Sequence, residues 1–196
     1  GSINIIDKNG NYVKELIAGE EGLSYEINPS ISFDGSKMAF VKVEKDSFAQ
    51  RVSHIFLTDQ DGKNQNQITN GDFGDYSPQF SPDGQLIYFI REDPNIFSPP
   101  IESQIYSIKI DGSDLKQITK KVDYVRGFSI SNNGKNLVYL GDKFGSYEYD
   151  KTLRILDLTT FKEAEHYEIN IGNYEPRPSY GGKGSQVSLK DPVFSP

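Results

Sequence analysis

Short stretches of alternating apolar and polar residues, separated by tight turn sequences, run through most of this chain. The clearest example is Ser77 to Phe89, SPQFSPDGQLIYF, in which two β-rich stretches flank the turn sequence Ser81 to Gly84. Proline sets φ at the first central turn position, aspartate bonds back to its own backbone, and glycine accepts positive φ. The pattern therefore predicts a β-hairpin with a bulge at the glycine. No segment shows convincing helical periodicity, so we expect an all-β fold.

This hairpin pattern recurs along the chain. Its turn serine occurs four times, at intervals of 49, 50 and 64 residues, as Ser32, Ser81, Ser131 and Ser195. A second unit, a strand that ends in an aspartate–glycine turn and returns as a short strand, recurs with Asp61 and Asp111 50 residues apart. Together the two units predict about four antiparallel strands, A to D, in every 50 residues. Four such strands form the blade of a β-propeller.

The repeats predict a single, partial β-propeller over residues 1–196. Three complete four-stranded blades are expected, at 29–69, 78–119 and 128–170. The remaining residues predict partial units: strands C and D of an incomplete blade at 3–17, a loop insertion at 171–191, and the first strand of a truncated blade at 192–196.

An arc of incomplete blades leaves apolar surface and strand edges without partners. Propellers usually contain at least four blades and close by pairing their terminal strands in one of them. We therefore expect the chain to belong to a larger propeller. The alternatives are a four-bladed ring that lacks one strand B, or two chains that complete one ring, so a homo-oligomer through open blade edges is a further expectation.

The motifs resemble the repeat of the TolB-like propeller family over nearly the whole chain. The match is best in the middle repeat, where SPQFSPDG is intact, whereas Phe33 replaces the turn proline in the first copy and Asn132-Asn133 replaces Pro-Asp in the third. The resemblance implies a bacterial, extracytoplasmic propeller, periplasmic or secreted, although no signal-peptide pattern is visible in the chain. It further implies a non-catalytic scaffold that binds proteins or cell-envelope polymers.

A second interpretation is the accessory, substrate-gating propeller of a prolyl-oligopeptidase-type serine peptidase, because such peptidases carry similar repeats beside an α/β-hydrolase domain. Some TolB-like propellers are metal-dependent polysaccharide lyases, which is a third possibility. A G-x-S-x-G unit after Pro196 would favour the peptidase, and a histidine cluster in later blades would favour the lyase.

Composition and short motifs argue against several kinds of partner and site. The net charge of -7 and the pI near 4.9 argue against nucleic acid as a partner, since phosphate binding needs clustered Lys and Arg. No apolar run reaches the ~20 residues that span a bilayer. The chain has no cysteine, two histidines and no G-x-S-x-G sequence. Asp59-x-Asp61-Gly62 is followed by Lys63 where a calcium loop needs a ligand. We expect no catalytic residue, cofactor or metal site.

Alternating strand direction places the A–B and C–D turns on one face and the D–A and B–C loops on the other. The first set is short and uniform, and the second is long and irregular, as binding loops on a rigid scaffold usually are. The D–A/B–C face is therefore the predicted binding face. Phe73, Tyr76 and Tyr124 are expected to pack between blades. The predicted partner-binding residues are the aromatic and arginine side chains of this face, the usual interface anchors: Phe97, Arg126, Tyr147, Tyr149, Tyr174, Arg177 and Tyr180.

Overall fold

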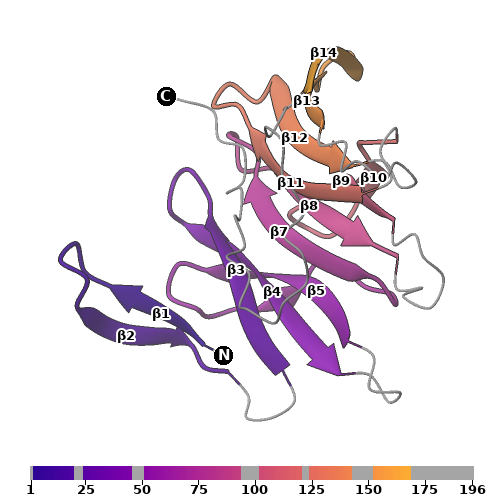
Figure 1. The fold of residues 1–196 in the computed structure, drawn as a ribbon. Helices are drawn as coiled ribbons and strands as arrows, with labels where there is room; N and C mark the ends of the chain where they lie inside the picture. The colour runs from indigo at the N-terminus through magenta and orange to yellow at the C-terminus, as the bar shows by residue number, and fades with distance from the viewer. Residues whose placement is uncertain are drawn as a thin grey trace, which may run out of the picture.

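The computed structural model describes residues 2–19, 24–45, 51–93, 102–120, 124–142 and 152–168. These ranges contain strands and turns but no helix, so the predicted all-β class is confirmed (Figure 1). The described residues accordingly include no helix that is long and apolar enough to cross a membrane. The strands are β1 (Ile3–Ile6), β2 (Tyr12–Ile17), β3 (Ser24–Ile31), β4 (Lys37–Lys45), β5 (Arg51–Asp59), β6 (Asn66–Gln67), β7 (Gly74–Phe80), β8 (Leu86–Glu92), β9 (Ser103–Lys109), β10 (Lys116–Gln117), β11 (Tyr124–Ile130), β12 (Asn136–Asp142), β13 (Thr152–Asp157) and β14 (Lys162–Glu168).

The strands pair as the repeat predicts, in four-stranded antiparallel blades. Blade 1 is β3–β4–β5–β6, blade 2 is β7–β8–β9–β10, and blade 3 is β11–β12–β13–β14. The N-terminal hairpin, β1 with β2, lies beside β3 (Figure 1). Blades 1 and 2 also join through one parallel residue pair, Ser53 with Gly74.

A serine hydroxyl closes each A–B turn. In blade 2, Ser81 Oγ donates to Asp83 Oδ1 at 2.6 Å and accepts the Leu86 N–H at 2.9 Å, while Gly84 N donates to the Ser81 carbonyl at 2.8 Å. Gly84 has the positive φ (69°) that this turn requires. Ser32 and Ser131 make the same bonds, to Asp34 and Asn133 respectively. The recurring serine and the residue two places after it are therefore determinants of the turn.

The irregularity of each A–B pair lies in strand A and not at the turn glycine, where the sequence predicted a bulge. The register shifts between Ile27 and Ser30 in blade 1 and between Tyr76 and Gln79 in blade 2. The turn itself needs no bulge because the serine hydroxyl accepts the first N–H of strand B. The shifts accompany positive φ at Asn28 (51°) and Ser77 (52°), and such bulges increase the local twist of a strand.

Strand D is only two residues long in blades 1 and 2, because a threonine side chain replaces part of its backbone pairing. Thr69 Oγ1 accepts the Ile55 N–H at 2.9 Å, and Thr119 Oγ1 accepts the Ile105 N–H at the same distance. Both threonines are buried. This explains the repeated Gln-Ile-Thr sequence that follows each aspartate–glycine turn.

The hydrophobic core lies between blades. Ile87 and Phe89 of blade 2 pack against blade 1, whereas Tyr88 and Ile90 pack against blade 3. Each blade is thus apolar on both faces and depends on its neighbours, as expected for a propeller. A third cluster joins the N-terminal hairpin to blade 1: Ile3, Ile17, Met38 and Phe40. The predicted insertion at 171–191 and the predicted truncated blade at 192–196 lie outside the described residues.

Candidate binding surface

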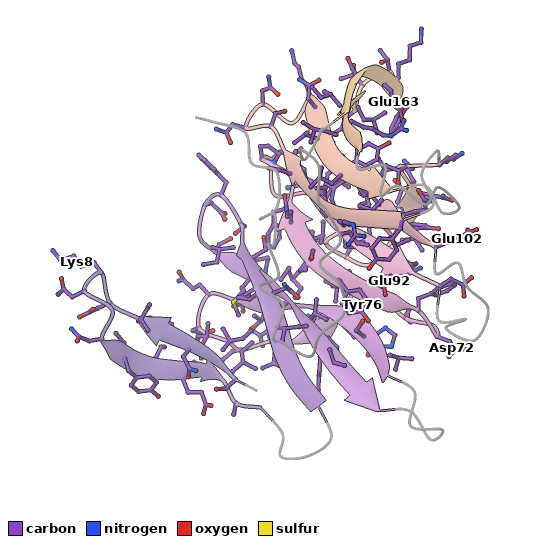
Figure 2. All side chains as sticks on the ribbon, viewed as in Figure 1. Lys8, Asp72, Tyr76, Glu92, Glu102 and Glu163 are labelled. Carbon is purple, nitrogen blue, oxygen red and sulfur yellow. The ribbon has the colours of Figure 1, made fainter. Side chains whose placement is uncertain are left out.

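The D–A and B–C ends of blades 2 and 3 carry the one predicted binding residue that falls within the described part of the chain, Arg126 on β11. The others fall outside the described residues: Phe97, Tyr147, Tyr149, Tyr174, Arg177 and Tyr180. Partner binding by these six residues therefore stays a prediction. Figure 2 shows Asp72, Tyr76, Glu92 and Glu102 at this same end of blade 2.

Arg126 belongs to a polar and aromatic cluster at the boundary of blades 2 and 3. Its guanidinium Cζ lies 5.7 Å from the centroid of the Tyr124 ring, and its side chain is exposed. The Tyr124 hydroxyl donates to Glu92 Oε1 at 2.9 Å. Tyr124 begins strand A of blade 3 and Glu92 ends strand B of blade 2, so this hydrogen bond ties the two blades together at the candidate surface.

Tyr124 is a hydrogen-bond donor at this surface and not a base. Burial raises the pKa of Tyr124 to about 12, and the charge and hydrogen bond of Glu92 add to the effect, while Arg126 opposes it. The phenol therefore remains protonated at neutral pH. A cluster of a neutral phenol, a carboxylate and an exposed guanidinium is suited to bind charged or polar groups.

Beneath this surface lies a buried ion pair that sequence reasoning missed. Arg91 Nε and Nη2 donate to the two carboxylate oxygens of Asp75 at 2.7 and 2.8 Å, and the two side chains are 8% and 0% exposed. The Arg91 guanidinium also lies over the rings of Phe73, Phe89 and Tyr106, at 4.7, 5.4 and 5.4 Å. The pair connects the start of β7 with the end of β8, and Arg91 supports Phe73 in the loop before β7.

A signal for this pair is present in the sequence. Asp75 is directly opposite Arg91 in the ladder, and Glu26 is opposite Lys42 at the same position of blade 1. Blade 3 has Val125 and Gly141 instead. Opposite charges at matching positions of strands A and B could therefore have identified the pair once the register was known.

Of the three rings predicted to pack between blades, Tyr124 bonds to Glu92 of blade 2 and Tyr76 interacts with Tyr124 of blade 3, whereas Phe73 packs on its own blade. Phe73 is 37% exposed and lies against the Arg91 guanidinium. The Tyr76 ring folds back over Gly74, where an added Cβ would lie 2.8 Å from its hydroxyl oxygen. Both rings are thus held at the D–A end of blade 2, where they are partly accessible.

Asp59 and Asp61, at the C–D turn of blade 1, bind nitrogens of the turn itself and of Lys37 at the start of β4. Asp59 binds Lys37 Nζ at 3.1 Å and Asn64 Nδ2 at 2.6 Å, and Asp61 binds the backbone and side-chain nitrogens of Lys63. Across the described ranges, His, Asp and Glu side chains form no group of three or more that could hold a metal ion.

Comparison with known proteins places this fold in a family. The family described as "Dipeptidyl peptidase IV (DPP IV) N-terminal region" matches residues 9–143. Dipeptidyl-peptidase 5 of Porphyromonas endodontalis is 30% identical over 90 residues, which are 46% of this chain and 12% of that protein. The Tol-Pal system protein TolB of Wolbachia pipientis is 40% identical over 55 residues, which are 28% of this chain and 13% of that protein.

A solved structure confirms the propeller fold. The β-propeller domain of the Trilobed protease from Pyrococcus furiosus superposes with a TM-score of 0.58 and 21% identity, over 75% of this chain and 43% of that chain. The chain thus matches only a small share of the length of its curated relatives, and its similarity extends to both peptidases and TolB proteins.

Proposed function

This chain belongs to the family of the dipeptidyl peptidase IV N-terminal region, and on that premise we propose that it is a non-catalytic propeller that binds polypeptide substrates for a peptidase. Of the two main functions considered from the sequence, the family match favours the accessory propeller. The match over residues 9–143 carries the proposal, because it includes the N-terminal turn, blades 1 and 2 and the Tyr124–Arg126 strand.

The chemistry of the candidate surface supports polypeptide binding. Phe73 and Tyr76 offer partly exposed rings, and Arg126 offers a guanidinium that can pair with carboxylates. The described charged side chains at this end, apart from the buried Asp75–Arg91 pair, are mainly acidic: Asp72, Glu92, Asp93 and Glu102 against Lys120 and Arg126. We therefore expect a preference for basic peptides and for free amino termini.

Peptide binding and peptide cleavage can be measured separately. The chain is titrated against fluorescein-labelled octapeptides of net charge +2 and −2, and anisotropy reports binding. We expect tighter binding of the basic peptide and no cleavage by the chain. Arg126→Ala should weaken the binding of peptides that carry a free carboxylate about 10-fold, equivalent to about 1.4 kcal/mol of binding free energy. Lys135→Ala, an exposed change in the A–B turn of blade 3, is the matched control.

The natural gene product, expressed in full, tests the peptidase part of the proposal. We expect it to hydrolyse dipeptidyl p-nitroanilides. A gene product without peptidase activity, or a chain that binds none of the octapeptides, contradicts the proposal.

A second function is a TolB-like scaffold that binds a protein or a cell-envelope polymer. The intact SPQFSPDG sequence and the 40% identity to TolB over 55 residues favour it. Capture of one envelope protein from a membrane extract, together with an inactive full gene product, would support it over the peptidase function. With either function we propose an extracytoplasmic location, in the periplasm or outside the cell.

A further inference from the structure

Asparagine is followed by glycine at three places in the chain, each in a turn or loop that the structure describes. The pairs are Asn9-Gly10, Asn70-Gly71 and Asn133-Gly134. An asparagine in this context is prone to lose its side-chain amide, because the backbone nitrogen of glycine can approach the side-chain carbon without a Cβ in the way. All three asparagines are exposed, so access to water does not distinguish them.

In the A–B turn of blade 3, hydrogen bonds hold both reacting groups of the pair. Gly134 N donates to the Ser131 carbonyl at 2.8 Å. Asn133 Oδ1 accepts from Ser131 Oγ at 2.7 Å and from Lys135 N at 3.0 Å, which fixes the side-chain amide. Attack of Gly134 N on the Asn133 side chain would therefore require several of these bonds to break.

The turn of the N-terminal hairpin restrains its pair through Asp7. Gly10 N donates to the Asp7 carbonyl at 3.0 Å. The Asp7 carboxylate accepts the backbone N–H groups of Asn9 and Asn11, at 2.8 and 2.9 Å. The glycine nitrogen that would attack is again a hydrogen-bond donor, and the backbone on both sides of it is held.

Asn70-Gly71 has none of these restraints. The pair lies between β6 and β7, in the D–A loop that leads from blade 1 to Phe73. Within the described ranges, neither the Asn70 side chain nor the Gly71 N–H has a hydrogen-bond partner. Gly71 has a φ of 101°, which glycine adopts without strain. Attack on the Asn70 side chain therefore requires no hydrogen bond to break first.

We propose that Asn70 is a modification site, at which the chain converts its own asparagine to aspartate and isoaspartate. Gly71 N forms a bond to Asn70 Cγ, the bond from Cγ to Nδ2 breaks, and the side-chain nitrogen leaves as ammonia with the proton of the Gly71 N–H. Water then opens the cyclic imide at either carbonyl, which gives aspartate or its β-linked isomer. Water is the only co-reactant, and no oxidant or reductant takes part.

The product alters the candidate binding surface. Either isomer adds a negative charge to an end of the molecule whose described charged side chains are mainly acidic. The β-linked isomer also lengthens the main chain close to Phe73, whose ring lies beside Gly71, since an added Cβ there would be 3.2 Å from Phe73 Cδ2. The modification itself does not depend on what this surface binds.

Peptide mapping by mass spectrometry follows all three pairs in one sample of the chain, incubated in mildly alkaline buffer. Because each hydrogen bond that must break should slow the attack about 2- to 10-fold, Asn70 should convert at least about 5-fold faster than Asn9 or Asn133. The same incubation in urea removes the fold. There the three rates should approach one another, because each site is then an asparagine before a glycine in an open chain.

Asp7→Ala tests whether hydrogen bonding sets the order of the rates. This exposed change removes the carboxylate that binds the Asn9 N–H, so conversion should accelerate at Asn9 and remain unchanged at Asn70. Circular dichroism checks that the variant is folded. Equal rates at the three pairs in the folded chain, or an unchanged order of rates in urea, overturn the inference. An Asn9 rate that Asp7→Ala does not raise also overturns it.

Discussion

Gly62 lies directly against the backbone of Leu16, so that an added Cβ would overlap the Leu16 carbonyl oxygen and lie 3.3 Å from its carbonyl carbon. Gly62 is in the C–D turn of blade 1, and Leu16 is in strand D of the N-terminal hairpin. This approach brings the main chains of neighbouring units into direct contact. The aspartate–glycine turn is therefore needed for contact between units as well as for the shape of the turn.

Gly62→Ala should destabilise the protein more than Gly112→Ala. The two glycines have nearly the same positive φ (81° and 83°), so both variants lose about 1–2 kcal/mol to the left-handed backbone. An added Cβ on Gly112 would make only an ordinary contact with the Ile68 carbonyl oxygen, at 3.5 Å. The overlap at Leu16 should add roughly 1–3 kcal/mol. Urea unfolding measures the difference in the free energy of unfolding. Equal destabilisation by the two variants would show that the N-terminal hairpin can shift away from residue 62 at no cost in free energy.

Breaking the Asp75–Arg91 pair should be costly, and removing both charges much less so. Arg91→Met leaves a fully buried carboxylate without its partner, which costs about 3–5 kcal/mol. Asp75→Leu combined with Arg91→Met should recover a large part of that loss, because no charge then remains buried. Lys37→Met, at the exposed Lys37–Asp59 pair, is the control and should have little effect. A double variant as unstable as Arg91→Met would contradict this view.

Tyr124→Phe should make stability less sensitive to high pH. The pKa of Tyr124 is about 12 in the folded protein and about 10 in an unfolded chain, so folding favours the protonated phenol. The stabilisation that depends on this proton is fully present below pH 10 and is lost as the pH rises from 10 to 12. The urea midpoint of the parent should therefore fall more steeply than that of the variant in this window. Parallel curves would mean that burial and Glu92 do not raise the pKa of Tyr124 in the folded protein.

Asp34→Asn should reduce sensitivity to acid while preserving the turn. The pKa of Asp34 is lowered to about 2, first by the Ser32 hydroxyl and then by the backbone N–H of Ser36. Its contribution is present above pH 4 and is lost as the pH falls from about 4 to 2. Asn133 accepts the same serine hydrogen bond in blade 3, so asparagine fits this turn. We expect similar midpoints at pH 7 and a smaller loss at pH 2.5 for the variant.

The candidate surface could be predicted only in part from the sequence. Strand alternation indicated the D–A/B–C face, and the choice of Arg126 came from its residue type and loop position. The Tyr124–Glu92 hydrogen bond joins side chains 32 residues apart in different blades. No local sequence pattern indicates which of the many acidic side chains will accept a hydrogen bond from this tyrosine hydroxyl. The Asp75–Arg91 pair required the exact register of β7 and β8.

Local signals in the amino-acid sequence determined the strand order, the tight turns and the fifty-residue repeat, because turn chemistry and period-two alternation act within a few residues. The propeller class follows from these signals. Only the tertiary structure decided which face of a strand meets which neighbour, where backbones approach as closely as Gly62 and Leu16, and which apolar residues, such as Ile31, remain uncovered. These features depend on packing between units about 50 residues apart. The contacts there are set by how two complete blades pack together and not by neighbouring residues in the sequence.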